Sequence, residues 1–570
     1  MREISLHRTN SSLINQEEFT LIIFNPNLSI ANLDETIYRR INDYVLFSND
    51  QSQLLTCVQS LSEETILLAI FHASVENTFL SQLHNLQQIN SIFILSSKEE
   101  NDPDLLNKFS KMIGIYTDET LMLEQIRTYL EQQSTLYFAF YHPKQIFTSH
   151  TKLTSTNARF LSNLLEKDLF REDYSTDKQF MIDKCREYYG RNPEELINIE
   201  LFEKTYEPTN AWQWYLKRCF ISKQLCKAFK TNDIKQLKLF AFFIRDLSST
   251  MQSVSSIDKI YTITRVSTNQ LQILLENIGN LMIFNGYFLV NSSHDELVSH
   301  AQVLVQFEVI NGSTATLYLV DPNTIIFDLG TTFQLDSFHF DEHVNRWHAT
   351  LIVVQNNQLI AQNYILTKQQ TMVRMTLPIL MGELLLISTG SLSKAKAYFE
   401  QLKNEDEALI YHFYGNIDYK KGDYDSALEH YQLSYQLMIS DERIRDSAFI
   451  LHDIGYVYDM KKELKQALDC HRQALEIRQT HYPDNDSHIG ISLYNIGRTL
   501  VTMDDHDQAL DIWKQTLPPD HSFRIQSIHS HAVVYFNKGD YEQAKRYYQE
   551  ALTLYETDTL DNQHGILMVF

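Results

Sequence analysis

The last third of the chain repeats one arrangement of small, apolar and aromatic positions. In four segments, a glycine or alanine is followed 12 residues later by an alanine, 16 later by a large ring and 19 later by a small residue. The four copies start at Gly415, Gly455, Gly497 and Ala532. Small residues let two antiparallel helices pack closely, and the ring fills the space between neighbouring pairs. With a weaker upstream copy that places Gly390 ahead of Ala395 and Phe399, the pattern predicts about five helix pairs over residues 376–558.

This arrangement resembles the tetratricopeptide repeat, and the wide spacing over residues 481–497 is similar to that of kinesin light chain. The resemblance implies a helical solenoid whose concave face is lined by the first helix of each repeat and binds a protein or peptide. The fifth and ninth repeat positions are the candidate peptide contacts: His412, Asn416, His452, Tyr456, Tyr494, Arg498 and His529. Histidine and tyrosine suit peptide contact. The same residues also fit an ordinary solvated helix face, and both interpretations stay open.

Short apolar runs alternate with helix-compatible segments over residues 1–145. The runs cover residues 20–26, 43–48, 65–72, 90–97 and 111–117. Continuous apolar strands separated by helices indicate a parallel sheet covered on both faces, so we expect a flavodoxin-like or receiver-like αβ sandwich. A phosphate-binding turn would need glycines, yet the first glycine in the chain is Gly114. His72 stands where a phospho-receiver needs aspartate, so the domain is expected to be structural or to bind protein.

The region from about residue 155 to 365 changes from helical to strand-like sequence, after a segment over residues 143–160 that reads as a linker. Helices followed by strands imply an α+β domain. The segments WYLKRCF, FFIRDL, FDLGTTF and WHATL resemble the toxin-like arginine-specific mono-ADP-ribosyltransferases. Enzymes of this family transfer ADP-ribose from NAD to a protein arginine. The resemblance implies an active site carried by three short motifs on strands.

All three motifs are degenerate in this chain. Thr262 stands where the family has the arginine that holds the NAD phosphates. The position of the ribose-pocket serine holds Leu289, or Val290 if the alignment slips by one residue. The two glutamate positions hold Pro322 and Thr324. A lost phosphate clamp and a lost carboxylate each remove several kcal/mol of transition-state stabilisation, roughly 10²–10³ in rate. We therefore expect an inactive domain and no cofactor.

The rival hypothesis is an active, NAD-dependent protein-arginine transferase that uses displaced groups and recruits its substrate through the repeats. Arg265 and Asp321 are the displaced groups, although strand alternation points each away from the family position. The weak candidates for contacts to NAD are Tyr261, Arg265, Asn291 and Ser292.

Composition narrows the classes of partner. The 570 residues carry a formal net charge of −23, which disfavours nucleic acid and anionic membrane surfaces. Five cysteines without a CxxC pair fit a reducing compartment, and the N-terminus lacks the apolar core of a signal peptide. The repeat histidines lie some 40 residues apart, so no metal site is expected. The sequence predicts a cytoplasmic protein-interaction scaffold.

Overall fold

The computed structural model divides into two compact units, residues 1–140 with 166–357 and residues 141–165 with 358–570. The chain therefore crosses between the units three times. The structure describes residues 7–8, 15, 19–26, 35–61, 65–71, 77–96, 108–109, 111–132, 138–141, 153–171, 178–254, 260–266, 268–291, 303–310, 315–321, 324–344, 346–354, 357–388, 391–483, 487–513 and 522–557.

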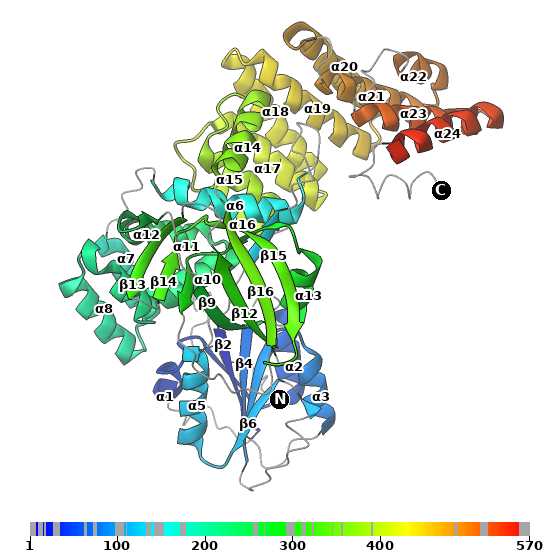
Figure 1. Cartoon of the computed structure of the whole chain (residues 1–570). Helices are drawn as coiled ribbons and strands as arrows, with labels where there is room; N and C mark the ends of the chain where they lie inside the picture. The colour runs from blue at the N-terminus through cyan, green and yellow to red at the C-terminus, as the bar shows by residue number, and fades with distance from the viewer. Residues whose placement is uncertain are drawn as a thin grey trace, which may run out of the picture. The chain divides into compact units, whose positions relative to one another are not determined.

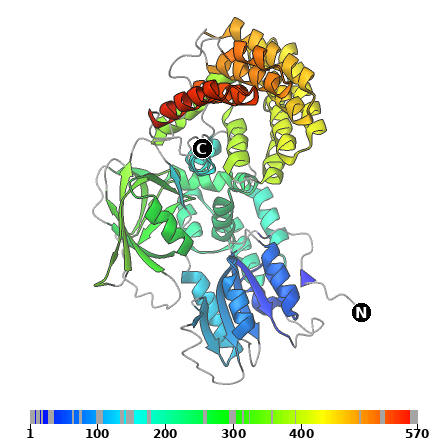
Figure 2. The ribbon, with the colours of Figure 1, turned by 90° about the vertical axis from the view of Figure 1, so that its right-hand side faces the viewer.

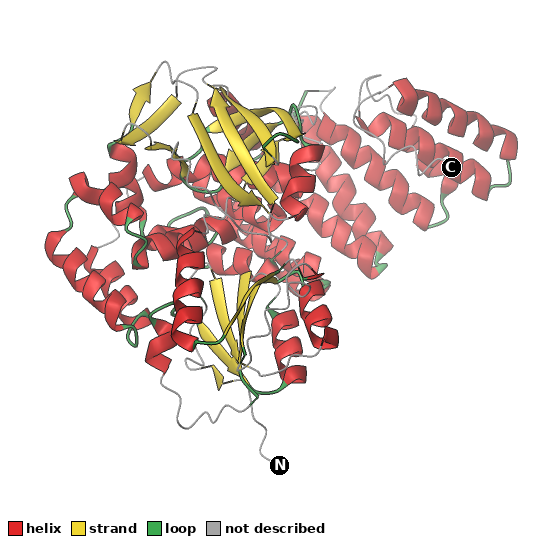
Figure 3. Ribbon diagram, turned by 60° about the horizontal axis from the view of Figure 1, so that its bottom comes forward, coloured by secondary structure: helices red, strands yellow, loops and turns green. Residues whose placement is uncertain are grey.

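The N-terminal part of the first unit is an α/β region built on a parallel sheet. Its strands are β2 (Phe19–Phe24), β3 (Val45–Ser48), β4 (Thr65–Phe71), β5 (Ile89–Leu95) and β6 (Met112–Tyr116), in the order β3-β2-β4-β5-β6, with β1 (His7–Arg8) antiparallel at the β3 edge. This is the flavodoxin-like strand order. The helices are α1 (Glu35–Arg39), α2 (Gln51–Ser60), α3 (Asn77–Asn85) and α5 (Glu119–Gln132) (Figure 3). Separate apolar clusters fill the two faces of the sheet, because each strand places apolar side chains on both of its faces.

A helical layer follows in the same unit. It comprises α7 (Lys178–Tyr188), α8 (Pro193–Thr205), α9 (Ala211–Leu216), α10 (Phe220–Thr231), α11 (Ile234–Leu239) and α12 (Ala241–Ser249). Buried Glu195 joins α8 to α10, accepting the Phe220 amide at 2.9 Å and the Lys223 ammonium at 2.7 Å. Asn192 caps α8 and donates to the carbonyl of Arg39 at 2.8 Å, which ties this layer to the α/β region.

Two sheets complete the first unit. One has the order β7-β10-β15-β16-β12-β9 and the other β11-β14-β13-β8. The bounds are β7 (Phe138–Tyr141), β8 (Gln252–Val254), β9 (Ile260–Val266), β10 (Leu281–Phe284), β11 (Phe288–Asn291), β12 (Val303–Ile310), β13 (Ala315–Asp321), β14 (Thr324–Phe327), β15 (Thr332–Asp341) and β16 (Arg346–Val354), with α13 (Thr268–Glu276) between β9 and β10. One apolar cluster takes residues from both sheets. The sequence pattern placed residues 138–141 in the first domain. In the structure these residues form β7, which lies at the edge of the sheet β7-β10-β15-β16-β12-β9.

The second unit is a solenoid of helix pairs, labelled in Figure 1 and seen as a curved row in Figure 2. The pairs are α15 (Leu377–Ser388) with α16 (Leu392–Phe399), α17 (Glu407–Lys421) with α18 (Tyr424–Ser440), α19 (Ile444–Lys461) with α20 (Leu464–His481), α21 (Ser487–Thr502) with α22 (His506–Trp513), and α23 (Ser522–Asn537) with α24 (Tyr541–Thr557). Helix α14 (Asn357–Thr371) precedes them, and the start of α6 (Ser155–Arg171) belongs to the same unit.

Close approach between glycine and ring explains the repeat spacing. A Cβ on Gly415 would stand 2.5 Å from the ring of Tyr431, and one on Gly455 would stand 2.5 Å from His471. In the first pair Gly382 meets Phe399 in the same way. Gly390, which the sequence pattern placed in this weaker copy, lies outside the described residues. Gly382 was not recognised as the small residue because it precedes Ala395 by 13 residues, one more than the spacing of the other copies.

Candidate functional site

The first predicted contact residues, His412 and Asn416, join neighbouring repeats. The Nε2 of His412 lies 2.7 Å from an oxygen of Asp453 on the next repeat, and the Asn416 amide nitrogen lies 3.3 Å from the same Nε2. Asn416 also accepts the Tyr431 hydroxyl at 2.8 Å. His412 is only 7% exposed, whereas Asn416 is half-buried. Asn416 therefore has more surface for a ligand than His412.

The next positions hold a histidine, a tyrosine and an arginine in contact. The ring of His452 lies 4.9 Å from that of Tyr456, and its Nδ1 lies 3.2 Å from the amide nitrogen of Asn495. The guanidinium of Arg498 lies 4.7 Å from the centre of the Tyr456 ring. Burial lowers the pKa of His452 well below its ordinary value. Charges on the flanking helices act in the same direction, from Arg478, His471, Arg498 and His488.

Asp459 is the acidic partner of this second group. It accepts Arg498 at 2.7 Å and the Thr499 hydroxyl at 3.0 Å, both from the following repeat. Burial alone would raise the pKa of Asp459, but the bond from His471 and the charges of His471 and Arg498 outweigh it and hold the pKa below its ordinary value. The side chain of Arg498 is 40% exposed, so one side of the guanidinium stays open to a ligand.

The remaining predicted contacts, Tyr494 and His529, are half-buried, and the His529 ring lies 5.6 Å from that of Tyr548. All seven positions thus lie on first helices of repeats, and their contact with a peptide stays a prediction. Sequence reasoning missed Asp453 and Asp459. Both occupy first-helix positions that face a neighbouring repeat, and only the fifth and ninth positions had been considered.

A cavity of about 580 Å³ opens beside Asn416. Its lining is mixed, with apolar side chains, hydroxyls, one acid and one lysine: Leu153, Thr154, Ser155, Glu383, Leu386, Ile387, Phe413, Asn416 and Lys420. The lining comes from α15, α17 and the segment at the start of α6. Glu383 is held in place by the Lys368 ammonium at 2.5 Å and the Tyr364 hydroxyl at 3.2 Å. The chemistry suits a peptide, which offers both apolar side chains and backbone polar groups.

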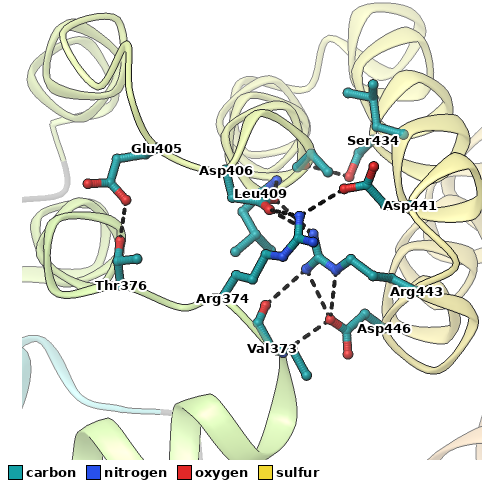
Figure 4. Close-up of polar contacts among 12 residues, drawn as sticks. Val373, Arg374, Thr376, Glu405, Asp406, Leu409, Ser434, Asp441, Arg443 and Asp446 are labelled. Carbon is teal, nitrogen blue, oxygen red and sulfur yellow. Dashed lines mark hydrogen bonds and ion pairs between the residues drawn. The ribbon is translucent and has the colours of Figure 1, made fainter.

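A buried ion-pair cluster fixes α14 and α15 to the repeats (Figure 4). Arg443 contacts both oxygens of Asp406 at 3.0 and 2.9 Å, Asp446 at 3.0 Å and the carbonyl of Val373 at 2.9 Å. Asp446 in turn accepts the Val373 amide at 3.1 Å. Arg374 binds the outer side of Asp406. These contacts hold the wall of the cavity that α15 contributes.

The strands that carry the degenerate motif positions lie together in the first unit. Strand β11 pairs with β14, with Val290 opposite Ile325, and β11 lies beside β9, which carries Thr262. Val290 is 0% exposed and belongs to the shared apolar cluster, and Thr324 is 8% exposed. Leu289 is half-buried and lies on the opposite face of β11 from Val290. The described side chains at these positions supply neither the cation nor the carboxylate that NAD would need, so they do not fit that cofactor.

Several candidates for NAD contact cannot be placed. Tyr261 is half-buried on β9. The side chains of Arg265, Asn291 and Asp321 lie outside the described part of the chain, as do Ser292 and Pro322 altogether. Within the described residues, no three His, Cys, Asp or Glu side chains cluster so as to hold a metal ion. Of the helices in the described ranges, none has the length and apolar character needed to cross a membrane.

Comparison with known proteins identifies the repeats. The family model described as "Tetratricopeptide repeat" matches residues 406–480 and 486–557. Superkiller complex protein 3 from Homo sapiens is 27% identical over 117 residues, which make up 20% of this chain and 7% of that protein. The chain thus spans a small part of that relative's length.

Solved structures of similar proteins include BtubC (BKLC) from P. vanneervenii, at 16% identity and a TM-score of 0.28, with 35% of this chain and 85% of that chain covered. They also include a putative kinesin light chain with nearly identical TPR-like repeats from Podosopora anserina, at 14% identity and a TM-score of 0.29, with coverage of 32% and 95%. The C-terminal part of the chain therefore contains tetratricopeptide repeats, as predicted. The resemblance of residues 155–365 to ADP-ribosyltransferases is not shown by these comparisons and stays a prediction.

Proposed function

We propose that this chain is a cytoplasmic protein-interaction scaffold whose tetratricopeptide repeats bind a peptide segment of another protein. The observation that supports it is the inner face of the repeats. There Asn416, Tyr456 and Arg498 present half-buried polar and aromatic groups, and Asn416 lines a cavity of about 580 Å³. Such groups lose little conformational entropy on binding, because the contacts between repeats already hold them in place. All five cysteines are thiols and not disulfide-bonded, which fits a reducing compartment.

A display library of random peptides selected on the full-length protein tests this function. Peptides enriched on the wild type are expected to lose at least tenfold in affinity on Asn416→Arg and on Arg498→Ala, since both changes alter the inner face. The matched control is Lys465→Ala, which alters an exposed residue of the second helix α20. Peptides that bind all of these proteins equally, or no enrichment at all, would contradict the proposal.

The proposal also assigns the part of residues 155–365 that lies in the first unit, residues 166–357, to an inactive ADP-ribosyltransferase-like domain. It is supported by the adjacency of β9, β11 and β14 and by the burial of Val290 and Thr324, which leaves little surface for NAD. Incubation of the full chain with labelled NAD and an arginine-rich acceptor is expected to transfer no label. The double variant Thr262→Arg, Thr324→Glu tests whether charge alone is missing. Transfer by the wild type would refute the inactive assignment and favour the NAD-dependent transferase.

A further inference from the structure

Helix α6 lies with the repeats although it is distant from them in sequence. Residues 141–165 belong to the repeat unit, while the repeats themselves begin more than 200 residues later. Leu153, Thr154 and Ser155 line the same cavity as Phe413 and Asn416 of α17. Figure 1 shows α6 beside the labels of α15 and α17. The start of α6 therefore lies against the face where the peptide contacts are predicted.

The helix begins with a defined cap and is then buried all round. The Asn157 amide donates to the Thr154 hydroxyl at 3.3 Å, and the Ala158 amide donates to the Thr154 carbonyl at 2.9 Å. Every residue from Phe160 to Leu165 is buried. A helix on the outside of a solenoid would expose one face to water. Burial of six consecutive residues, which cover the whole circumference, shows that other parts of the protein pack on every side of this stretch.

Helical spacing tells which side of α6 faces the array. Residues three and four apart share a face, so the side that starts at cavity-lining Thr154 continues through Ala158, Leu161 and Leu165. These three side chains are fully buried. Helical spacing thus directs a small-to-large apolar stripe with a hydroxyl-rich start toward the repeats, and the cavity lies at the start of this stripe.

We propose that residues 153–165 are an internal ligand of the repeat array, and that partner proteins bind it with an apolar helical segment of the same kind, displacing α6. This inference rests on the proposed peptide-binding function and specifies its partner class and its regulation. A tethered ligand acts at an effective concentration on the order of 1 mM. If the groove binds a free helix with a Kd of roughly 10 µM, competition from tethered α6 would lower the apparent affinity for a partner helix about 100-fold.

The probe is a fluorescein-labelled synthetic peptide with the sequence of residues 153–171, titrated with full-length protein and followed by anisotropy. Leu161→Asp places a charge on the buried stripe and should release α6. The peptide is expected to bind this variant 10- to 100-fold more tightly than the wild type. Leu161→Ala should give a smaller gain in the same direction, and it decides the matter if Leu161→Asp does not fold. Adding Asn416→Arg to either variant should abolish the gain, while Lys465→Ala should leave it unchanged.

Cross-linking tests the position of α6 independently. A benzophenone amino acid at exposed Ser155 should form intramolecular links to α15 and α17, and excess unlabelled peptide should reduce their yield.

Two Leu161 variants that bind the peptide no more tightly than wild type would show α6 to be a permanent part of the array and overturn the inference. A display-selected peptide serves as a parallel probe. If it binds while the α6 peptide does not, only this inference fails; if neither binds, the proposed function fails as well.

Discussion

Arg443→Ala is the sharpest test of what holds the repeat unit together. The side chain of Arg443 is 8% exposed, and it neutralises Asp406 and Asp446, which are themselves 8% and 2% exposed. Removing the guanidinium leaves buried Asp446 without this counter-charge and leaves Asp406 with only its exposed partner Arg374, which costs about 3–5 kcal/mol. The Val373 carbonyl loses its donor at the same time. The contacts of α14 and α15 with the repeats should weaken most.

Arg374 provides the matched control, because it binds the same Asp406 from the solvent side. Its side chain is 52% exposed, with ion pairs of 3.3 Å to Asp406 and 2.8 Å to Asp441. Exposed pairs of this kind contribute about 0–1 kcal/mol. Arg374→Ala therefore removes an ion pair with the same acid while leaving the buried cluster intact.

Native-state hydrogen exchange of α17 and α19 is the appropriate assay, since a chain of two units does not unfold in one step. For Arg443→Ala, amide exchange should be about 10²–10³-fold faster, since each 1.4 kcal/mol corresponds to a factor of ten. Arg374→Ala should change it by less than about fivefold. Equal effects of the two substitutions would refute the reasoning, because burial would then not determine the cost.

Three further predictions concern single residues. Gly415→Ala should destabilise the repeats by ~1–3 kcal/mol despite the better helix former, since the new carbon would meet the Tyr431 ring at 2.5 Å; a raised midpoint of thermal unfolding by circular dichroism would contradict this. Burial keeps the pKa of His452 low in the folded chain. Below about pH 6.5 the imidazole therefore gains a proton only in the unfolded chain, and the free energy of unfolding measured in urea should fall by up to about 1.4 kcal/mol per pH unit. His452→Gln should remove that slope and His481→Gln, at an exposed position, should keep it. Burial raises the pKa of Cys219 to about 11, so iodoacetamide at neutral pH should modify it only after unfolding, as mass spectrometry can check.

The elements whose residue types are set by local packing could be predicted from sequence. The apolar run over residues 65–72 became β4 because a strand buried on both faces must be apolar throughout. The distance from Gly415 to Tyr431 predicted a helix pair because the ring needs a neighbour without a Cβ. Such signals lie within one or two elements, so they need no knowledge of distant contacts.

Features that depend on distant contacts were not predicted. Residues 155–160 were assigned to a linker, and their serine, threonine and asparagine suit loop sequence, yet they open α6 and belong to the unit of helices formed much later in the chain. Among the cavity residues, only Asn416 came from the repeat pattern. Glu383 and Leu386 lie on α15, whose Gly382 departs by one residue from the spacing of the other copies and was not recognised. Which side of a first helix faces the next repeat also follows only from the assembled solenoid, so the contacts of Asp453 could not be predicted.

The interleaved chain order has a consequence for biosynthesis. Helix α6 leaves the ribosome more than 200 residues before α15 and α17 are made. At about 5–20 residues per second, its Leu161 and Leu165 lack these neighbours for roughly 10–40 s. During that interval the apolar stripe is available to molecular chaperones. A nascent chain released before residue 421 leaves the stripe uncovered by the complete α17, which makes truncated products of this gene targets for quality control.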